Sequence, residues 1–388
     1  MSARRPLPRW ADVVLLPVLN LLLALIVFSI LVALIGQNPL QALGIMVNGA
    51  FGYGEGIGFT LHFATSFVFT GLCVAVAAHA GLFNIGGEGQ AYVASLGAIA
   101  VGFALDHVGW LVALPYHLSF LIVLPLAILA STILGAAWAF IPGYLQAKRG
   151  SHVVITTIMF NFIASSLMAY LLVYVLKPQG VQEPSTANVV AAGKIPQLRE
   201  LFPWLNLGGA PLNVTVIFAV LALIGVYVLI WRTKFGYALR TMGHSPSASL
   251  YAGISNSRMI ILVMMISGGL AGMVAVNEVL GVQSRIVIDV TAGYGFVGIA
   301  VALMGRNHPI GIALAAILFG ALYQGGLDLQ FYMPAITRDM IVVIQALVIM
   351  FTGAMEGLLR PGLETAFMLY SPRQKAEAAA RETVGTEG

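Results

Sequence analysis

The feature that most restricts the fold of this chain is a series of long, uninterrupted apolar blocks. Examples are residues 21–35, 118–141 and 214–231. Each block approaches the roughly 20 residues that an α-helix needs to cross the ~30 Å hydrocarbon core of a bilayer. Only 9% of the residues are charged, whereas a soluble domain carries about 25%. The chain lacks the ionised groups to cover a globule in water, so the sequence predicts an all-α integral membrane protein.

The apolar blocks define ten predicted membrane spans. They lie at about residues 13–35, 59–79, 88–108, 118–141, 152–176, 212–231, 258–280, 292–304, 309–329 and 338–358. The eighth is short for a full crossing. The segment 13–35 is too long for the apolar part of a cleaved signal peptide and has no small-x-small cleavage pattern after it. We therefore expect it to remain as the first span, which puts both termini on one side.

The basic residues orient these spans. Cytoplasmic loops of membrane proteins carry an excess of Lys and Arg. The side without the termini holds only Lys177, Lys194, Arg199, Arg285 and Arg338, and all other basic residues lie on the side of the termini. Both termini are therefore expected in the cytoplasm. No Lys or Arg lies between Trp10 and Ala147, so spans two to four are oriented only by their order in the chain.

The spans and the polar stretches between them suggest how the chain is organised. We expect a transmembrane domain at 1–358, with an extracytoplasmic segment at 177–211, a cytoplasmic loop at 232–258, and a charged, Ala-rich cytoplasmic tail at 359–388. Spans two to five and seven to ten would form two four-span groups of inverted orientation. Each group contains a glycine-broken stretch, and paired interruptions of this kind are typical of a transport pathway.

The first polar constellation is residues 80–90, in which Asn84, Glu88 and Gln90 stand among four glycines between two apolar runs. Freed backbone groups in a bilayer must find partners inside the protein or face water. The functional interpretation is that these three side chains line a solute path; the structural alternative is a tight turn with Glu88 as a helix cap. The chain has no G-x-x-x-x-G-K-[ST] motif, so no P-loop for ATP is expected.

The second constellation is the cytoplasmic stretch 233–254. Ser245 and Pro246 form a typical helix start, with Ser as the cap and Pro at the first position, and Gly253 is a typical helix end. A short helix under the membrane, flanked by glycines, suits insertion into a groove of a partner. The alternative is an ordinary structured loop.

These residues resemble a known family. The stretch Gly-Leu-Phe-Asn-Ile-Gly-Gly-Glu-Gly-Gln at 81–90 resembles the signature of permeases of bacterial ATP-binding-cassette (ABC) importers, in the branch of ribose, branched-chain amino-acid and nucleoside permeases. It is most similar to the longer nucleoside or simple-sugar permease. The stretch 233–254 is similar to the loop that docks into the ATPase subunit. The family usually has Ala-Val-Gly-Glu-Asn-Pro where this chain has Thr-Met-Gly-His-Ser-Pro at 241–246, so polar contacts of that loop are not carried over.

The resemblance implies a fold and a set of residues. The fold is a type II-like ABC importer permease, a transport subunit and not an enzyme. The residues themselves predict Asn84, Glu88 and Gln90 in the translocation path and Gly86, Gly87, Gly89, Gly293 and Gly295 at helix breaks. The resemblance implies Arg240, Gly243, Pro246, Ala248, Gly253 and Ile254 in ATPase coupling.

The resemblance also implies partners and a location. No cofactor or metal is expected in this chain, because ATP and Mg²⁺ would bind a separate ABC ATPase subunit. A second permease chain, in a heterodimer, and a periplasmic or lipid-anchored binding protein would complete the complex in the bacterial inner membrane. The cargo would be a small neutral solute, a nucleoside or simple sugar; no nucleic acid is expected.

Two alternatives remain open from the residues alone: a permease for branched-chain amino acids and an ion-coupled secondary transporter. The latter needs intramembrane acids or an acid–base pair, and among the acids only Glu88 stands out. The remaining polar residues are interpreted as structural: His62 as packed or interfacial, and Asn277, Glu278 and Asp328 as interfacial. Gly268 and Gly272 are spaced for close helix packing.

Overall fold

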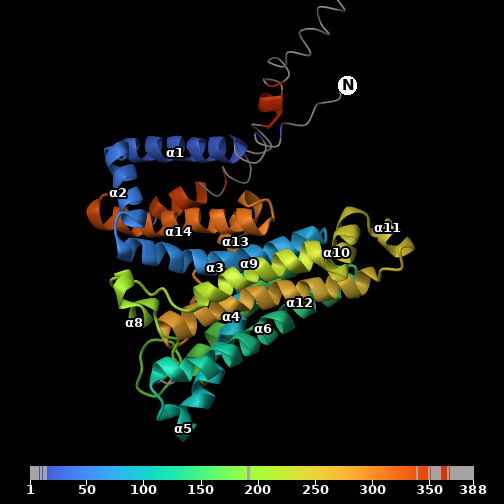
Figure 1. Cartoon of the computed structure of the whole chain (residues 1–388), viewed down its shortest axis with the longest axis horizontal. Coiled ribbons are helices and arrows are strands. Elements are labelled where there is room, and N and C mark those ends of the chain that lie inside the picture. The colour runs from blue at the N-terminus through green and yellow to red at the C-terminus, as the bar shows by residue number, and fades with distance from the viewer. Residues whose placement is uncertain are drawn as a thin grey trace, which may run out of the picture. The chain divides into compact units, whose positions relative to one another are not determined.

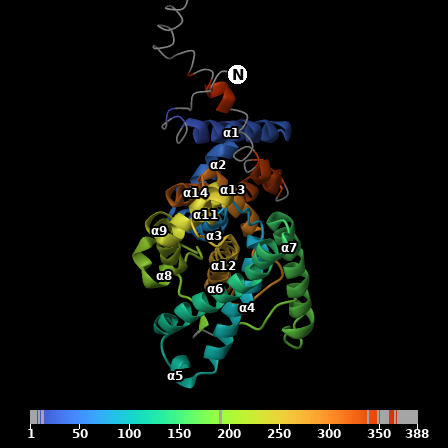
Figure 2. The same cartoon turned by 90° about the vertical axis from the view of Figure 1, so that its right-hand side faces the viewer.

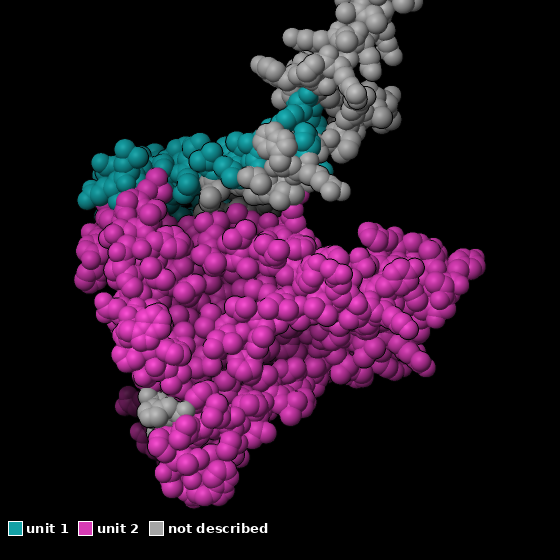
Figure 3. Space-filling view, viewed as in Figure 1, with its two compact units in different colours: residues 1–42, 335–388 teal, residues 43–334 magenta. Residues whose placement is uncertain are grey.

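The computed structural model describes residues 15–189, 193–337, 340–347 and 360–364, together with residues 8, 11, 350 and 367. Within this part the secondary structure is helical, and extended pairing is limited to two isolated bridges, Ser185 with Val287 and Gln197 with Asn213. The chain divides into two compact units, residues 1–42 with 335–388 and residues 43–334 (Figure 3).

Unit 1 contains α1 (Leu16–Leu34), and residues 340–347 are helical as well. The first predicted span is therefore confirmed as a helix over 16–34. The ends of the predicted tenth span, and most of the predicted tail 359–388, lie outside the described residues. The next helix, α2 (Pro39–Phe51), was not among the predicted spans, and its 13 residues are too few to cross a bilayer.

Unit 2 holds a bundle of long helices with several short ones at its ends (Figures 1 and 2). In chain order these are α3 (Gly54–His79), α4 (Gly87–Asp106), α5 (Gly109–Val112), α6 (Tyr116–Arg149), α7 (Val153–Tyr170) with the π-helix η2 (Leu171–Val175), α8 (Leu198–Leu201), the 3₁₀ turn η4 (Pro203–Leu205), α9 (Thr215–Arg232), α10 (Lys234–His244), α11 (Pro246–Tyr251), α12 (Asn256–Ala275) with the π-helix η5 (Val276–Gln283), α13 (Tyr294–Met304) and α14 (Pro309–Tyr332).

Seven helices of the described chain, all in unit 2, are long and apolar enough to cross a membrane. This confirms a multi-pass, all-helical membrane protein, although not the full count of ten spans. α13 has only 11 residues, which agrees with the short eighth span predicted.

α3 is the central helix of unit 2. It packs against α12, α13, α14 and α9, and 89% of its membrane-length window is buried inside the protein. A helix that is apolar or small on every side is suited to this position. α3 therefore contacts most of the elements that carry the polar groups described below.

α6 and α12 pack at backbone distance. A Cβ added at Gly135 of α6 would overlap the carbonyl oxygen of Gly268, and one at Gly272 would overlap the carbonyl oxygen of Ser131. Small residues allow such approaches between membrane helices. The packing predicted for Gly268 and Gly272 is confirmed.

Candidate translocation and coupling site

Glu88 lies in the first turn of α4, and its carboxylate binds the start of α13. Oε1 accepts hydrogen bonds from the Thr291 hydroxyl at 2.5 Å and from the Gly293 amide at 2.9 Å, and Oε2 accepts one from the Gly295 amide at 2.7 Å. A helix N-terminus has free N–H groups and favours negative charge. Glu88 is thus a helix cap, but it caps a helix that lies 207 residues further along the chain and not its own.

The two predicted glycine-broken stretches meet at this point. A Cβ at Gly295 would overlap the backbone nitrogen and Cα of Glu88. Gly293 has φ of +80°, a left-handed conformation that glycine adopts without strain. The interruption at 86–89 and the interruption at 293–295 therefore form one contact between α4 and α13.

Asn84 and Gln90 join the turn before α4 to the neighbouring helices. The two side-chain amides bond each other reciprocally at 3.0 and 3.1 Å, and Asn84 Nδ2 also donates to the Ser267 hydroxyl of α12 at 2.8 Å. Asn84 Oδ1 accepts from the Gly86 amide at 2.9 Å. Both side chains are buried in this structure, and their role in a solute path stays a prediction.

A further residue that stabilises this turn, Asn161, was not predicted from the sequence. Asn161 of α7 accepts from the Gly89 amide and donates to the Ile85 carbonyl oxygen, each at 2.9 Å. One side chain thus satisfies two backbone groups freed by the break before α4. A single Asn within the apolar span 152–176 is the signal that could have identified it.

The short helix predicted to start at Ser245 and Pro246 is present as α11. The Ser245 hydroxyl accepts from the Ala248 amide at 3.3 Å, Pro246 is the first residue of α11, and Gly253 follows its end with φ of +75°. Ile254 closes the turn through its amide to the Ser249 carbonyl oxygen at 2.9 Å. The helix start and stop predicted from these residues are confirmed.

α10 connects this helix to the turn after α3. A Cβ at Gly243 would overlap the carbonyl oxygen of His79, and one at Gly81 would lie 3.4 Å from the Cα of Gly243. Arg240 lies one turn earlier in α10 and is partly buried. Because residues 80–86 carry Asn84 and lead directly into α4, α10 contacts the turn that precedes Glu88.

The chain matches known transport proteins over most of its length. The family model described as "Branched-chain amino acid transport system / permease component" matches residues 56–353. The chain belongs to this family. This confirms the resemblance to ABC importer permeases, and the chain is a transport component whose ATPase is a separate subunit. No solved structure matches the chain significantly.

The relatives of this permease include sugar and nucleoside transport proteins. The glucose ABC transporter permease protein TsgB13 of Haloferax volcanii is 32% identical over 375 residues, covering 95% of this chain and 94% of the relative. The nucleoside ABC transporter permease protein NupB of Lactococcus lactis is 31% identical over 349 residues, covering 87% and 90%. A second nucleoside permease protein of that organism, NupC, is 26% identical over 266 residues, covering 67% and 78%.

A second buried polar cluster of the permease was misassigned from the sequence. Asn277 and Glu278, predicted to be interfacial, are 1% and 5% exposed. Glu278 Oε1 accepts from the Ser66 hydroxyl at 2.7 Å and lies 3.5 Å from Nε2 of His62. The reason for the error is that α12 continues as the π-helix η5, so these residues lie inside the bundle. An adjacent amide and acid in an apolar helix are themselves a signal of an internal site.

The segment 177–211 is bound to the loop that precedes α13. The Thr186 amide donates to the Ile286 carbonyl oxygen, and the Ile286 amide donates to the Thr186 hydroxyl, both at 3.0 Å. Arg285 and Glu183 form an ion pair at 2.9 Å on the surface of the same contact. The segment is thus attached to the loop between η5 and α13.

The start of α3 makes two further polar contacts. The Tyr53 hydroxyl donates to Asp328 at 2.8 Å, and the Gly209 amide donates to Glu55 at 2.9 Å. Partial burial together with the bond to Asp328 raises the pKa of Tyr53 to about 12, so the phenol remains a donor at neutral pH. Asp328, predicted to be interfacial, is bound to residues of its own chain.

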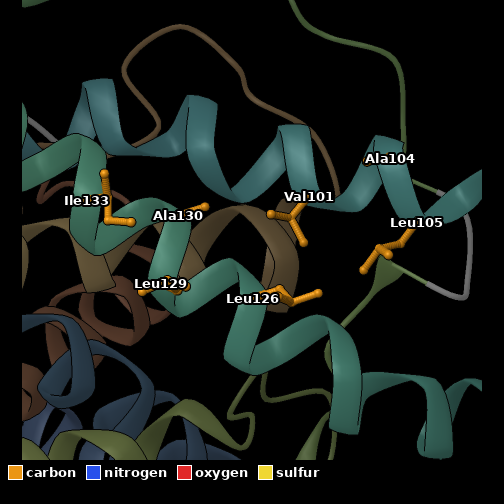
Figure 4. A pocket seen from close by; sticks show the side chains of 7 residues that line it. All are labelled: Val101, Ala104, Leu105, Leu126, Leu129, Ala130 and Ile133. Atoms are coloured by element: carbon orange, nitrogen blue, oxygen red, sulfur yellow. The ribbon is translucent and has the colours of Figure 1, made fainter.

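One apolar pocket of about 290 Å³ lies between α4 and α6 (Figure 4). It is lined by Val101, Ala104, Leu105, Leu126, Leu129, Ala130 and Ile133. None of these side chains can form a hydrogen bond, so the pocket cannot recognise a polar solute. The groups able to do so lie around α3, α12 and α13.

Proposed function

We propose that this permease moves an uncharged nucleoside or simple sugar into the cell. The relatives that it matches are named for glucose and nucleosides, and the low content of charged residues suits a neutral cargo better than a strongly anionic one. The proposed mechanism rests on the contact between Gly243 and the turn at His79. This contact connects the stretch 233–254 to the break in the chain before α4.

We place the permease in the bacterial inner membrane with both termini in the cytoplasm. The distribution of Lys and Arg supports this orientation. We further propose ten crossings in two inverted four-span groups, of the type II-like kind. The contact between the interruptions at 86–89 and 293–295 supports a pathway at the interface of the two groups.

In the proposed mechanism ATP and Mg²⁺ bind a partner ATPase, and α11 docks on it. The helix α11 projects from one end of the bundle (Figure 1), and its Tyr251 is 96% exposed and its Leu250 62% exposed. Arg240, Gly243, Pro246, Ala248, Gly253 and Ile254 would hold this helix in position. Its displacement would reach the turn at 79–81 through α10, and then Glu88 and α13.

We expect a binding protein and a second permease in the complex. A periplasmic or lipid-anchored binding protein would deliver solute to the face that carries the segment 177–211, where Trp204 is 77% exposed. Two different nucleoside permease proteins occur in one organism among the relatives, which favours a heterodimer over a homodimer.

The proposal is tested with the chain expressed together with its neighbouring genes. The purified complex is expected to contain an ATPase and, in vesicles, to accumulate radiolabelled uridine or glucose only while ATP is supplied. Uptake that persists after ATP depletion with the proton gradient intact would contradict an ATP-driven importer. Uptake of leucine alone would favour the branched-chain amino-acid alternative.

The orientation has its own test. The chain has one cysteine, Cys73, and it is buried, so single added cysteines can be labelled with little background. Tyr251→Cys should react with an impermeant maleimide only from the cytoplasmic side, and Trp204→Cys only from the outer side. Labelling of residue 251 from outside would rule out contact with an ATPase.

A further inference from the structure

The middle of α3 carries polar groups that bond only one of the two carboxylate oxygens of Glu278 among the described residues. Ser66 lies at the midpoint of this 26-residue helix, about 18 Å from either end at 1.5 Å per residue. It bonds Glu278 Oε1, which also accepts from Asn277 Nδ2 at 3.1 Å and faces His62. In the described part of the chain, Glu278 Oε2 receives no hydrogen bond, although the residue is 5% exposed.

An aromatic cluster adjoins these groups. The ring of Phe67 lies 5.4 Å from that of Tyr294 and 5.0 Å from that of Tyr323, between centroids. Phe63 lies one turn earlier and contacts both tyrosine rings and the imidazole of His62. Tyr294 is buried and Tyr323 is half-buried, and neither hydroxyl bonds any described residue, although tyrosine hydroxyls in such positions usually have a partner.

These features together indicate a ligand site. Polar and ionisable groups deep in a membrane protein are costly and mark substrate pathways, and transporter sites lie near the bilayer midplane at interrupted helices. Here a carboxylate oxygen and two phenol hydroxyls, all unpaired within the described residues, lie beside aromatic faces. Tyr294 is also the first residue of α13, between the two glycines that bond Glu88.

We propose that Glu278, Tyr294 and Tyr323, with the ring of Phe67, form the solute-binding site of the permease. This rests on the proposed function. The chemistry fits an uncharged ring compound with adjacent N–H or O–H donors: Glu278 accepts from the donors, the phenols bond its oxygens or ring nitrogens, and the aromatic faces stack on the ring. Nucleosides and simple sugars share this chemistry.

The contact between Glu88 and the start of α13 also connects the turn before α4 to this site. Glu88 bonds the amides on both sides of Tyr294, so movement of the turn before α4 carries Tyr294 with it. Displacement of that ring would separate it from Phe67 and open the site. His62, Ser66 and Asn277 act as positioning residues, because they hold Glu278 through Oε1 and leave Oε2 for the solute.

The test uses the complete complex in proteoliposomes, with uptake of radiolabelled uridine, adenosine and glucose measured over a range of concentrations. Glu278→Gln should raise the KM about ten-fold or more, as expected for loss of a hydrogen bond to a charged acceptor. Tyr323→Phe removes one hydroxyl and should raise it about two- to ten-fold. The matched controls are Glu364→Gln, an acid of the predicted tail that pairs with Arg360, and Tyr144→Phe, an exposed tyrosine of α6.

Basal ATPase activity and co-purification of the subunits show whether a variant has assembled. A raised KM in both variants, with assembly and basal ATPase activity unchanged, supports the site. The solute whose KM rises shows which class of compound the site binds. An unchanged KM for Tyr323→Phe and for an assembled Glu278→Gln overturns it. If Glu278→Gln does not assemble, Tyr323→Phe alone decides. Failure of the wild-type complex to take up any of the three solutes contradicts the proposed function instead.

Discussion

Gly295 packs directly against the backbone of Glu88, and its amide donates to Glu88 Oε2 at 2.7 Å. The start of α4 and the start of α13 are therefore joined by both a steric and an electrostatic contact. Each helix begins at a break in the chain, and the free amides at the start of α13 are satisfied by the carboxylate at the start of α4. The start of α13 therefore depends on Glu88, whereas the break before α4 is satisfied by Asn84 and Asn161.

Glu88→Gln should destabilise this junction. The amide offers one acceptor oxygen in place of two, so an NH₂ group must face the Gly293 or Gly295 amide. Loss of a hydrogen bond to a charged acceptor costs about 1.5–3 kcal/mol. We expect a lower melting temperature of the detergent-purified complex and slower uptake, with Glu364→Gln as the control. A lower melting temperature with unchanged uptake would limit Glu88 to a structural role.

Gly243→Ala should uncouple ATP hydrolysis from transport. The added Cβ would overlap the His79 carbonyl oxygen, and tightly packed backbone cannot yield without displacing α10. The control is Gly225→Ala in α9, where a Cβ meets nothing within 4 Å. We expect Gly243→Ala to insert normally but to lose most ATP-driven uptake. Normal uptake per ATP hydrolysed would show that this contact transmits nothing.

Tyr251→Ala should weaken binding of the ATPase subunit. The side chain is 96% exposed at the end of α11, and aromatic residues dominate the binding energy of many interfaces, often by 2 kcal/mol or more, or roughly 30-fold in affinity. Co-purified ATPase is measured by quantitative gel analysis. Tyr144→Ala, on α6, should leave the amount unchanged. Equal recovery in both variants would contradict docking through α11.

Thr186→Val should detach the segment 177–211 from the loop before α13. The substitution removes the hydroxyl oxygen that accepts a hydrogen bond from the Ile286 amide. A buried amide left without a hydrogen bond costs about 1–3 kcal/mol of stability. Stimulation of the ATPase by the binding protein should fall, while basal ATPase activity persists. Thr156→Val, in α7, serves as the control. Full stimulation in Thr186→Val would show that the segment is not needed for that signal.

Local features of the fold were predictable because their causes are local. The apolar blocks indicate the long helices, Ser245 and Pro246 indicate the start of α11, and the glycines at 268 and 272 indicate close packing. The partner of Glu88 was not predictable, because no local pattern connects it to residues 291–295. For the same reason the sequence could not show that the two breaks meet.

The His62–Glu278 pair is the clearest miss. It is the type of intramembrane acid–base pair expected of an ion-coupled carrier, and its members lie in separate helices 216 positions apart, so neither segment alone reveals it. Family membership assigns the chain to ATP-driven permeases, which leaves recognition of solute as the role that we propose for Glu278. The uptake assay with ATP depleted distinguishes a role of Glu278 in ion coupling from a role in solute recognition.

Thr186 and Ile286 each donate a hydrogen bond to the other. The segment 177–211 and the loop leading to α13 should therefore move together. In the proposed mechanism, a binding protein on the outer face would act on α13 from this end, and the ATPase in the cytoplasm would act on it from the other end through Gly243 and Glu88. In this mechanism the short helix α13 would receive both signals, solute delivery from one end and ATP hydrolysis from the other, so ATP hydrolysis without delivered solute would not open the site.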